Sequence, residues 1–150
     1  VSADGPLPEG MRVQVMLQAG SQREGVPFMR PVRAADDGTF RLDGAFGRQY
    51  VRASVVGSGD RPGWQLEAVR RDGRDVTDEL LEFTGAPIEL EIVMTSRIAT
   101  VEGTVTWDKR GPAPPVVVVF AADEALWEMP TRWVRATPVS DAGTFEIRGL

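Results

Sequence analysis

The side chains that could support chemistry in this chain are mainly carboxylates, arginines and tryptophans, because its 150 residues include no His and no Cys. These two absences exclude thiol and imidazole nucleophiles and general bases, Ser-His-Asp and Cys-His arrangements, and most zinc sites. Glu89 and Glu91 lie on the outer face of one predicted strand, whereas a glycosidase needs two facing acids in a cleft. We therefore expect a protein without enzymatic activity and without catalytic residues.

Oxygen ligands for a calcium ion could come from Asp72, Asp75 and Asp78, which are close in sequence. The spacing of an EF-hand is absent, and Asp, Thr and Gly are also the residues that turns use. We expect a structural turn here and no metal site, and the sequence indicates no cofactor.

Tryptophan side chains are the candidates for ligand binding. Trp107, Trp127 and Trp133 fall within one stretch and could stack on sugar rings. Tryptophan also fills protein cores, so packing within or between modules is the alternative for these three residues. Trp64 differs, because Trp64, Leu66 and Ala68 alternate with polar residues and are expected to face the core of the first module.

Composition limits the possible partners. The formal net charge is −5 and the pI is about 4.8, which disfavours nucleic acid and anionic membranes. The longest apolar run, Val116–Ala122, is too short to cross a bilayer, so we expect no membrane insertion. The chain begins at Val1 without a signal-peptide pattern, and we interpret it as a fragment or a processed chain.

Alternating apolar and polar residues predict strands along most of the chain. The clearest strands are expected at residues 11–17 and 88–94. Further strands are expected at 39–43 and 64–68, at 50–56 without a defined inward face, and at 27–34 at a sheet edge because it contains two prolines. Val116–Phe120 is a β-branched run, predicted to be buried on both faces or nearly so. Asp75–Phe83 alone has mild helical character, expected as a single turn capped by Asp75 or Thr77.

A turn sequence occurs twice. Residues 36–40 read Asp-Asp-Gly-Thr-Phe and residues 141–145 read Asp-Ala-Gly-Thr-Phe, so that Gly38 and Gly143 are 105 positions apart (143 − 38). Gly5 and Gly111 share nearly this offset, 106 positions (111 − 5), which indicates an internal repeat. The strand at 97–105 has only Val1 as its counterpart at the start of the first repeat.

Two tandem β modules are therefore expected, and both are incomplete. The first covers residues 1–96 and lacks its leading strand, and the second covers residues 97–150 and holds only the first half of a module. Many short strands with Gly and Pro turns and almost no helix favour an all-β fold built from antiparallel β-sandwiches.

The repeated motif resembles a known signature. Gly38-Thr39-Phe40 with Gly44 and Tyr50, and the matching residues 143–150, resemble the G-x-F-x-x-x-G-L-P-P-G-x-Y signature of carboxypeptidase regulatory-like domains. Val101-x-Gly103-x-Val105 is similar to their leading strand. Ala45-Phe46-Gly47-Arg48 departs from the signature, where Leu-Pro-Pro-Gly is typical.

This resemblance implies a transthyretin/prealbumin-like, Ig-like β-sandwich without catalytic activity, one of the tandem bacterial modules carried by large exported proteins. We expect a structural or interaction module on the cell surface, in the periplasm or secreted, with neighbouring modules of the same protein, another protein or a glycan as partners. The alternative is a carbohydrate-binding module that uses exposed tryptophans. An exposed row of tryptophans would favour the alternative, and buried tryptophans would favour the first hypothesis.

Overall fold

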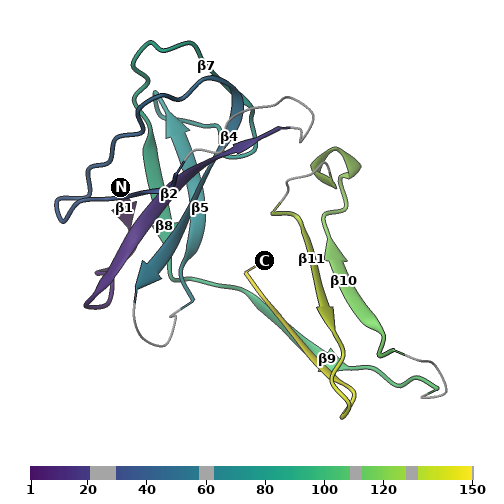
Figure 1. Ribbon diagram of the computed structural model, residues 1–150. Coiled ribbons are helices and arrows are strands. Elements are labelled where there is room, and N and C mark those ends of the chain that lie inside the picture. The colour runs from purple at the N-terminus through teal and green to yellow at the C-terminus, as the bar shows by residue number, and fades with distance from the viewer. Residues whose placement is uncertain (21–29, 58–62, 109–112, 128–131, 150) are drawn as a thin grey trace. The chain divides into compact units, whose positions relative to one another are not determined.

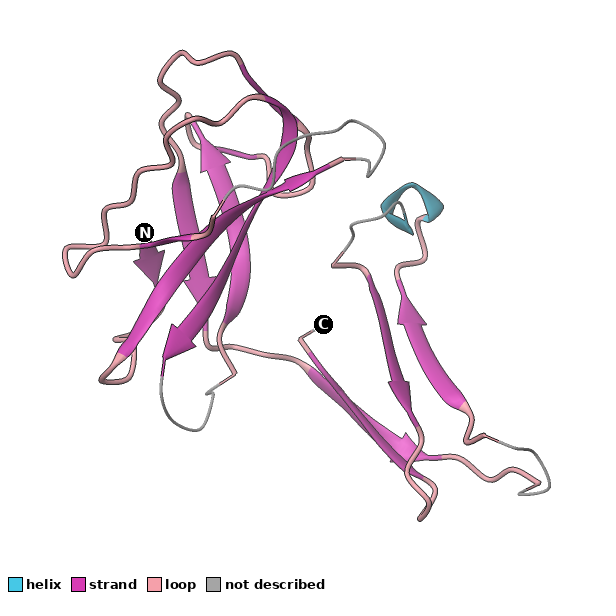
Figure 2. Ribbon diagram, in the orientation of Figure 1, coloured by secondary structure: helices cyan, strands magenta, loops and turns pink. Residues whose placement is uncertain are grey.

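The computed structural model describes residues 1–20, 30–57, 63–108, 113–127 and 132–149. The chain divides into two compact units, Val1–Arg97 and Ile98–Leu150, and each is treated separately below. Strands dominate both units, and the described residues contain no α-helix, only the short 3-10 segment η1 (Glu124–Trp127) (Figure 2). The all-β class predicted from the sequence is confirmed.

The first unit is built from two four-stranded sheets (Figure 1). One has the order β3 (Val32–Arg33), β2 (Met11–Ala19), β4 (Gly47–Gly57), β7 (Leu81–Phe83). The other has the order β1 (Ser2–Ala3), β8 (Glu91–Thr95), β5 (Gln65–Arg71), β6 (Arg74–Asp75). Neighbouring strands are antiparallel except β1 and β8, which are parallel.

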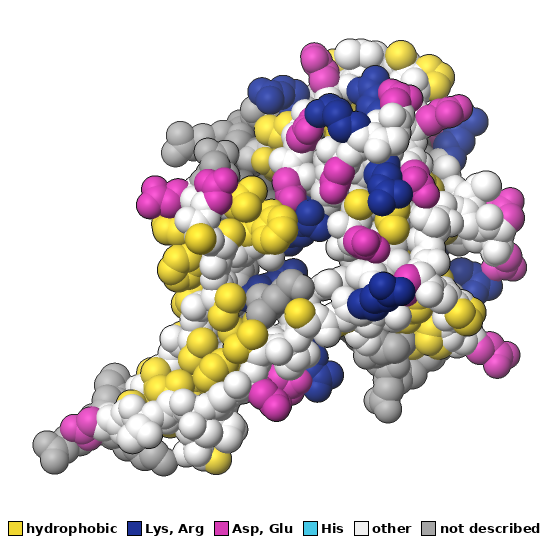
Figure 3. Space-filling model, turned by 180° about the vertical axis from the view of Figure 1, so that it is seen from behind, with side chains coloured by type: hydrophobic (Ala, Val, Ile, Leu, Met, Phe, Trp, Pro, Cys, Tyr) yellow, Lys and Arg dark blue, Asp and Glu magenta, His cyan; other side chains and the backbone are white. Residues whose placement is uncertain are grey.

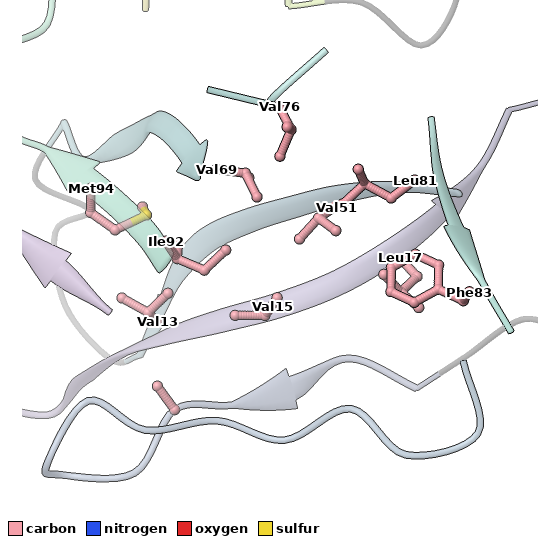
Figure 4. Packing of buried hydrophobic residues seen from close by; sticks show 11 residues of the cluster. Val13, Val15, Leu17, Val51, Val69, Val76, Leu81, Phe83, Ile92 and Met94 are labelled. Carbon is pink, nitrogen blue, oxygen red and sulfur yellow. The ribbon is translucent and has the colours of Figure 1, made fainter. Parts of the chain in front are cut away.

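The two sheets of the first unit share one core, as in a β-sandwich (Figure 4). Alternate residues of β2 are buried, as the sequence pattern predicted: Met11, Val13, Val15 and Leu17. The last three of these share one cluster with Ile92 and Met94 of β8 and Val69 of β5. Burial of each such side chain contributes about 1.5–3 kcal/mol to stability, so this face fixes how the sheets pack.

The strand predicted at 64–68 is displaced. β5 begins at Gln65 and runs to Arg71, and an irregularity between Leu66 and Ala68 interrupts its pairing with β8. The extra residue is Glu67, so Leu66 and Val69, opposite Met94 and Ile92, both lie against the core cluster. Ala68, which the sequence pattern had placed on the core face, is buried opposite Val93 and lies outside that cluster. Trp64 precedes the strand and is only half-buried, although it packs against the core cluster.

The helical character predicted for Asp75–Phe83 is limited to one turn, in which the Glu79 amide donates to Val76 O at 3.1 Å, and no helix forms. The segment forms a turn and then β7, in which Leu81 and Phe83 are buried on either side of the exposed Glu82. A carboxylate oxygen of Asp75 accepts a bond from the Thr77 amide at 2.9 Å, which closes an Asx-type turn. The Thr77 hydroxyl in turn accepts a bond from the buried Val69 amide at 2.8 Å, so contacts with β5 override the local helical preference.

Two further strands are shorter than the sequence predicted. β8 starts at Glu91, and Ile88 and Leu90 pack against the core without joining the strand. β3 covers only Val32–Arg33, and it lies at the edge of its sheet, as its prolines indicated. Residues 27–29 of that predicted strand lie outside the described residues.

The described residues of the second unit form two strand pairs. β9 (Thr100–Thr104) pairs with β12 (Thr144–Arg148), and β10 (Val116–Phe120) pairs with β11 (Val134–Pro138), both antiparallel. The expected burial of β10 on both faces is wrong. Only Val117 and Val119 are half-buried, because packing covers one face of this strand pair and leaves the other exposed.

The first copy of the repeated turn is closed by backbone bonds. The Gly38 amide donates to Ala35 O at 2.9 Å, and the Ala35 amide donates to Thr39 O at 2.8 Å. Gly38 has φ +79°, which is accessible mainly to glycine. An Asp37 carboxylate oxygen also accepts a bond from the Thr39 amide at 2.9 Å.

The second copy has the same backbone bonds. The Gly143 amide donates to Ser140 O and the Ser140 amide donates to Thr144 O, both at 2.9 Å, and Gly143 has φ +85°. The Ser140 hydroxyl takes the place of the Asp37 carboxylate by accepting the Thr144 amide at 3.1 Å. The matching turn sequences thus form matching turns.

The strand predicted at Thr39–Asp43 is wrong, although its counterpart after the second turn is β12. Exposed and half-buried residues still alternate there, with Phe40 and Leu42 packed against the core. β12 is a strand because β9 pairs with it, and none of the described strands pairs with 39–43. An extended segment without a ladder partner is not a β-strand.

Candidate functional site

The apolar β10–β11 face is the most prominent surface feature of the second unit. We define it by three directly opposed residue pairs on one side of the two strands: Val116 with Pro138, Val118 with Ala136, and Phe120 with Val134. The side chains of Val116, Val118 and Phe120 are 58%, 47% and 55% exposed. Figure 3 shows hydrophobic side chains gathered over this unit. Soluble proteins rarely expose large contiguous apolar patches, so this face is the candidate functional site of the second unit.

Trp127 extends this face at the end of β10. η1 places its ring 5.1 Å from the Phe120 ring at 83°, the edge-to-face geometry that aromatic pairs prefer. The indole N–H donates a 2.7 Å hydrogen bond to Ala121 O, which fixes the ring. Trp127 therefore presents apolar surface, 40% exposed, while its polar group is already used within the protein.

The other two candidate tryptophans lie in different surroundings. Trp133 precedes β11, is 37% exposed and carries the Arg132 guanidinium 4.7 Å from its ring centre. Trp107 follows β9 and is half-buried beside the second turn, where its ring would lie 3.7 Å from a side-chain carbon added at Gly143. Trp127 thus belongs with the apolar β10–β11 face, whereas Trp107 packs against a turn.

The aspartates considered for calcium make turns and ion pairs. Asp72 has φ +52° and forms the tight turn between β5 and β6 together with Gly73. Asp75 accepts the Thr77 bonds, and Asp78 lies 3.8 Å from the Arg52 guanidinium. Among the residues that the structure describes, no group of three or more acidic side chains is placed to hold a metal ion.

The two glutamates considered for a glycosidase site, Glu89 and Glu91, lie in different surroundings. Glu91 accepts a 2.9 Å bond from the Ser2 hydroxyl and lies 3.7 Å from the Arg70 guanidinium. Glu89 is exposed ahead of β8. Exposed carboxylates lack the desolvation that turns one member of a glycosidase pair into an acid.

Where a pKa is shifted, the shift takes it further from neutral pH. The Ser96 amide and Thr95 hydroxyl lower the pKa of Asp4, and the Thr39 hydroxyl and amide lower that of Asp37. Carboxylate hydrogen bonds raise the pKa of Arg41, beside Asp43, and of Arg148. General acid–base catalysis needs the opposite, pKa values close to the working pH.

A shallow hollow of about 350 Å³ opens in the first unit where β2 and β4 meet. It is lined by Gly10, Arg12, Arg33, Val56 and Gly57. Arg12 is held by an ion pair with Asp36 at 2.5 Å. These described lining residues include no carboxylate and so provide no acid–base pair.

Comparison of the chain with family models, characterised proteins and solved structures found no match. Within the described ranges, no helix combines the length and apolar character required to cross a membrane. From the sequence we expect the second module to expose an apolar face around Val116–Phe120, but the side of β10 that forms the apolar β10–β11 face was not predicted. Five consecutive apolar residues do not indicate which side is left exposed, and the flanking Trp127 was the only signal.

Proposed function

We propose that this chain is a non-enzymatic interaction module that binds protein surfaces through the apolar β10–β11 face. The single observation that carries the proposal is the exposure of Val116, Val118 and Phe120 on one side of a strand pair. Covering such a face with another apolar surface contributes about 25 cal/mol per Å² of apolar area removed from water.

The absence of enzymatic activity is part of this proposal. It is supported by the lack of His and Cys and by the hydrogen bonds that lower the pKa of Asp4 and of Asp37 further from neutral pH. The purified chain is expected to show no turnover of peptide, ester or glycoside substrates above background. Turnover that is lost on replacing one acidic residue would contradict it.

A protein partner fits this face better than a glycan. The six residues that define it are all aliphatic, aromatic or proline, whereas sugar recognition combines a stacking ring with polar groups that bind hydroxyls. The Trp127 N–H, a natural donor to a sugar hydroxyl, is bonded to Ala121 O. The face therefore suits an apolar protein surface.

Neighbouring modules of the same polypeptide are the partners we propose. The support is the repeated turn around Gly38 and Gly143 and its resemblance to carboxypeptidase regulatory-like domains, which occur in tandem on exported bacterial proteins. By that resemblance we place the protein outside the cytoplasm, in the periplasm, at the cell surface or secreted.

A lysine substitution tests the binding face. Val118→Lys puts a charge in the centre of the face, and a second copy of the chain serves as the model partner. Sedimentation velocity at rising concentration should show weak self-association of the parent chain and its loss in Val118→Lys. Val101→Lys is the matched control, because Val101 is 41% exposed on β9, outside the face, and should associate like the parent. Self-association of Val118→Lys equal to that of the parent would contradict the proposal.

Carbohydrate binding remains the second candidate function, favoured by the exposure of Trp127 and Trp133. Titration with soluble oligosaccharides, followed by tryptophan fluorescence, tests it. Saturable quenching that Trp127→Ala or Trp133→Ala abolishes, while Trp64→Ala retains it, would favour the glycan hypothesis over a protein partner.

A further inference from the structure

Val1 makes the same kind of hydrogen bond to the first turn as Val105, the residue that follows β9, makes to the second turn. The amino group of Val1 donates to Gly38 O at 2.9 Å, and the Val105 amide donates to Gly143 O at 2.7 Å. Both acceptors occupy the same position in matching turns. Val1 therefore stands beside its turn as Val105 stands beside the second one.

From Val105 the chain runs back into β9, which pairs with β12. Thr104 is opposite Thr144, Gly103 opposite Phe145 and Val101 opposite Ile147. The bond from Val105 to Gly143 continues this antiparallel ladder by one step.

The first unit contains the counterpart of β12, the segment Thr39–Asp43, but the structure describes no counterpart of β9 beside it. Thr39–Asp43 follows its turn with the same alternation as β12. Phe40 and Leu42 are half-buried against the core, and the other three residues of the segment are exposed. No described strand pairs with this segment, yet the Val1–Gly38 bond already provides the first step of a ladder along it.

We propose that Thr39–Asp43 is a strand-accepting edge whose occupant is an antiparallel β-strand joined directly to the amino end of Val1. Backbone pairing along the edge provides the affinity, as in other cases of strand addition. The register follows from Val1, because the residue joined to it comes opposite Thr39, as Thr104 comes opposite Thr144.

The occupant also needs a glycine at one position. A side-chain carbon added at Gly103 would lie 2.9 Å from Cε1 of Phe145, so the ring occupies the space above that glycine. Phe40 is the counterpart of Phe145 after the first turn. The strand that pairs with Thr39–Asp43 therefore carries a glycine opposite Phe40, two residues ahead of Val1.

This inference does not rest on the proposed function, because it concerns a different edge in the other unit. The test uses the full chain extended ahead of Val1 by Ile-Ala-Thr-Val-Glu-Gly-Thr, the sequence of residues 98–104. The matched control is the same extension with valine in place of its glycine. Backbone amide hydrogen exchange is measured by NMR for the parent and both extended chains, with the Ile92 amide reporting that the core is folded.

The glycine extension should slow exchange of amides within 39–43 by about tenfold or more relative to the parent, since they enter a hydrogen-bonded ladder. The valine extension should give clearly less protection, with Ile92 unchanged. Unchanged exchange at 39–43 in the glycine extension would overturn the proposal, and equal protection by both extensions would overturn the glycine requirement. Protection in the parent that rises with concentration would assign the edge to a second copy and also overturn it.

Discussion

The amino group of Val1 lies 2.9 Å from the carbonyl oxygen of Gly38 and donates a hydrogen bond to it. The contact joins the first residue of the chain to a turn that lies far along the sequence. It also leaves little room at the turn, because a side-chain carbon at Gly38 would come within 3.1 Å of Val1 O.

Gly38→Ala should therefore cost more stability than Gly44→Ala. The two glycines have nearly equal φ values, +79° and +77°, so each alanine pays about 1–2 kcal/mol of left-handed strain. The added side-chain carbon would meet Val1 at Gly38, whereas at Gly44 it would have no atom within 4 Å. Crowding should add about 1 kcal/mol or more at Gly38. Urea denaturation of both variants measures the difference, and equal midpoints would show that Val1 does not confine the turn.

Asp4 should make the first unit sensitive to acid. The Ser96 amide and the Thr95 hydroxyl hold its carboxylate at 3.0 and 2.7 Å, which lowers its folded pKa below the unfolded value of about 3.9. Its contribution is complete above the unfolded pKa and is lost as the pH falls through the folded pKa.

The comparison of the parent with Asp4→Asn isolates this group from the other carboxylates. The parent should be more stable at pH 7, and the gap between the two urea midpoints should narrow as the pH falls below about 4. A gap that stays constant from pH 7 to about pH 2.5 would show that the Asp4 charge does not anchor β1 to the end of β8.

Trp64→Ala should destabilise the first unit by about 2 kcal/mol. The side chain packs against the core but is half-buried, so the loss should fall below the about 3–5 kcal/mol typical of fully buried aromatic residues. Phe46→Ala is the control in the same unit, because Phe46 is 69% exposed and should matter little. Trp127→Ala should also cost less than Trp64→Ala. Urea denaturation followed by circular dichroism measures these losses of stability. If Trp64→Ala unfolds at the same urea concentration as the parent, Trp64 does not stabilise the core, and a role at the surface becomes the better interpretation.

Thr77→Val should cost about 1–3 kcal/mol, because it leaves the buried Val69 amide without an acceptor. Thr77→Ser keeps the hydroxyl and should cost less. The measurement is the urea midpoint together with hydrogen exchange at Val69. If the valine variant were as stable as the serine variant, the Thr77 hydroxyl would not be what holds the 75–83 turn against β5.

The sequence alone was sufficient where one face of a strand meets the core along its whole length. In β2 the period of two is unbroken from Met11 to Leu17, and a slip by one residue would place these side chains in water. The paired Gly38 and Gly143 turns were predicted for a similar reason, because their geometry depends on local residues and on positive φ.

Contacts distant in sequence decided the remaining features. The bulge in β5, the turn after Asp75 and the state of Thr39–Asp43 each depend on what lies across a ladder or a core, and no local pattern contains that information. The same holds for the candidate site. The run Val116–Phe120 determined by itself that a β-strand forms, whereas only the tertiary structure decided that one side stays exposed, because burial depends on which other segments pack against a strand.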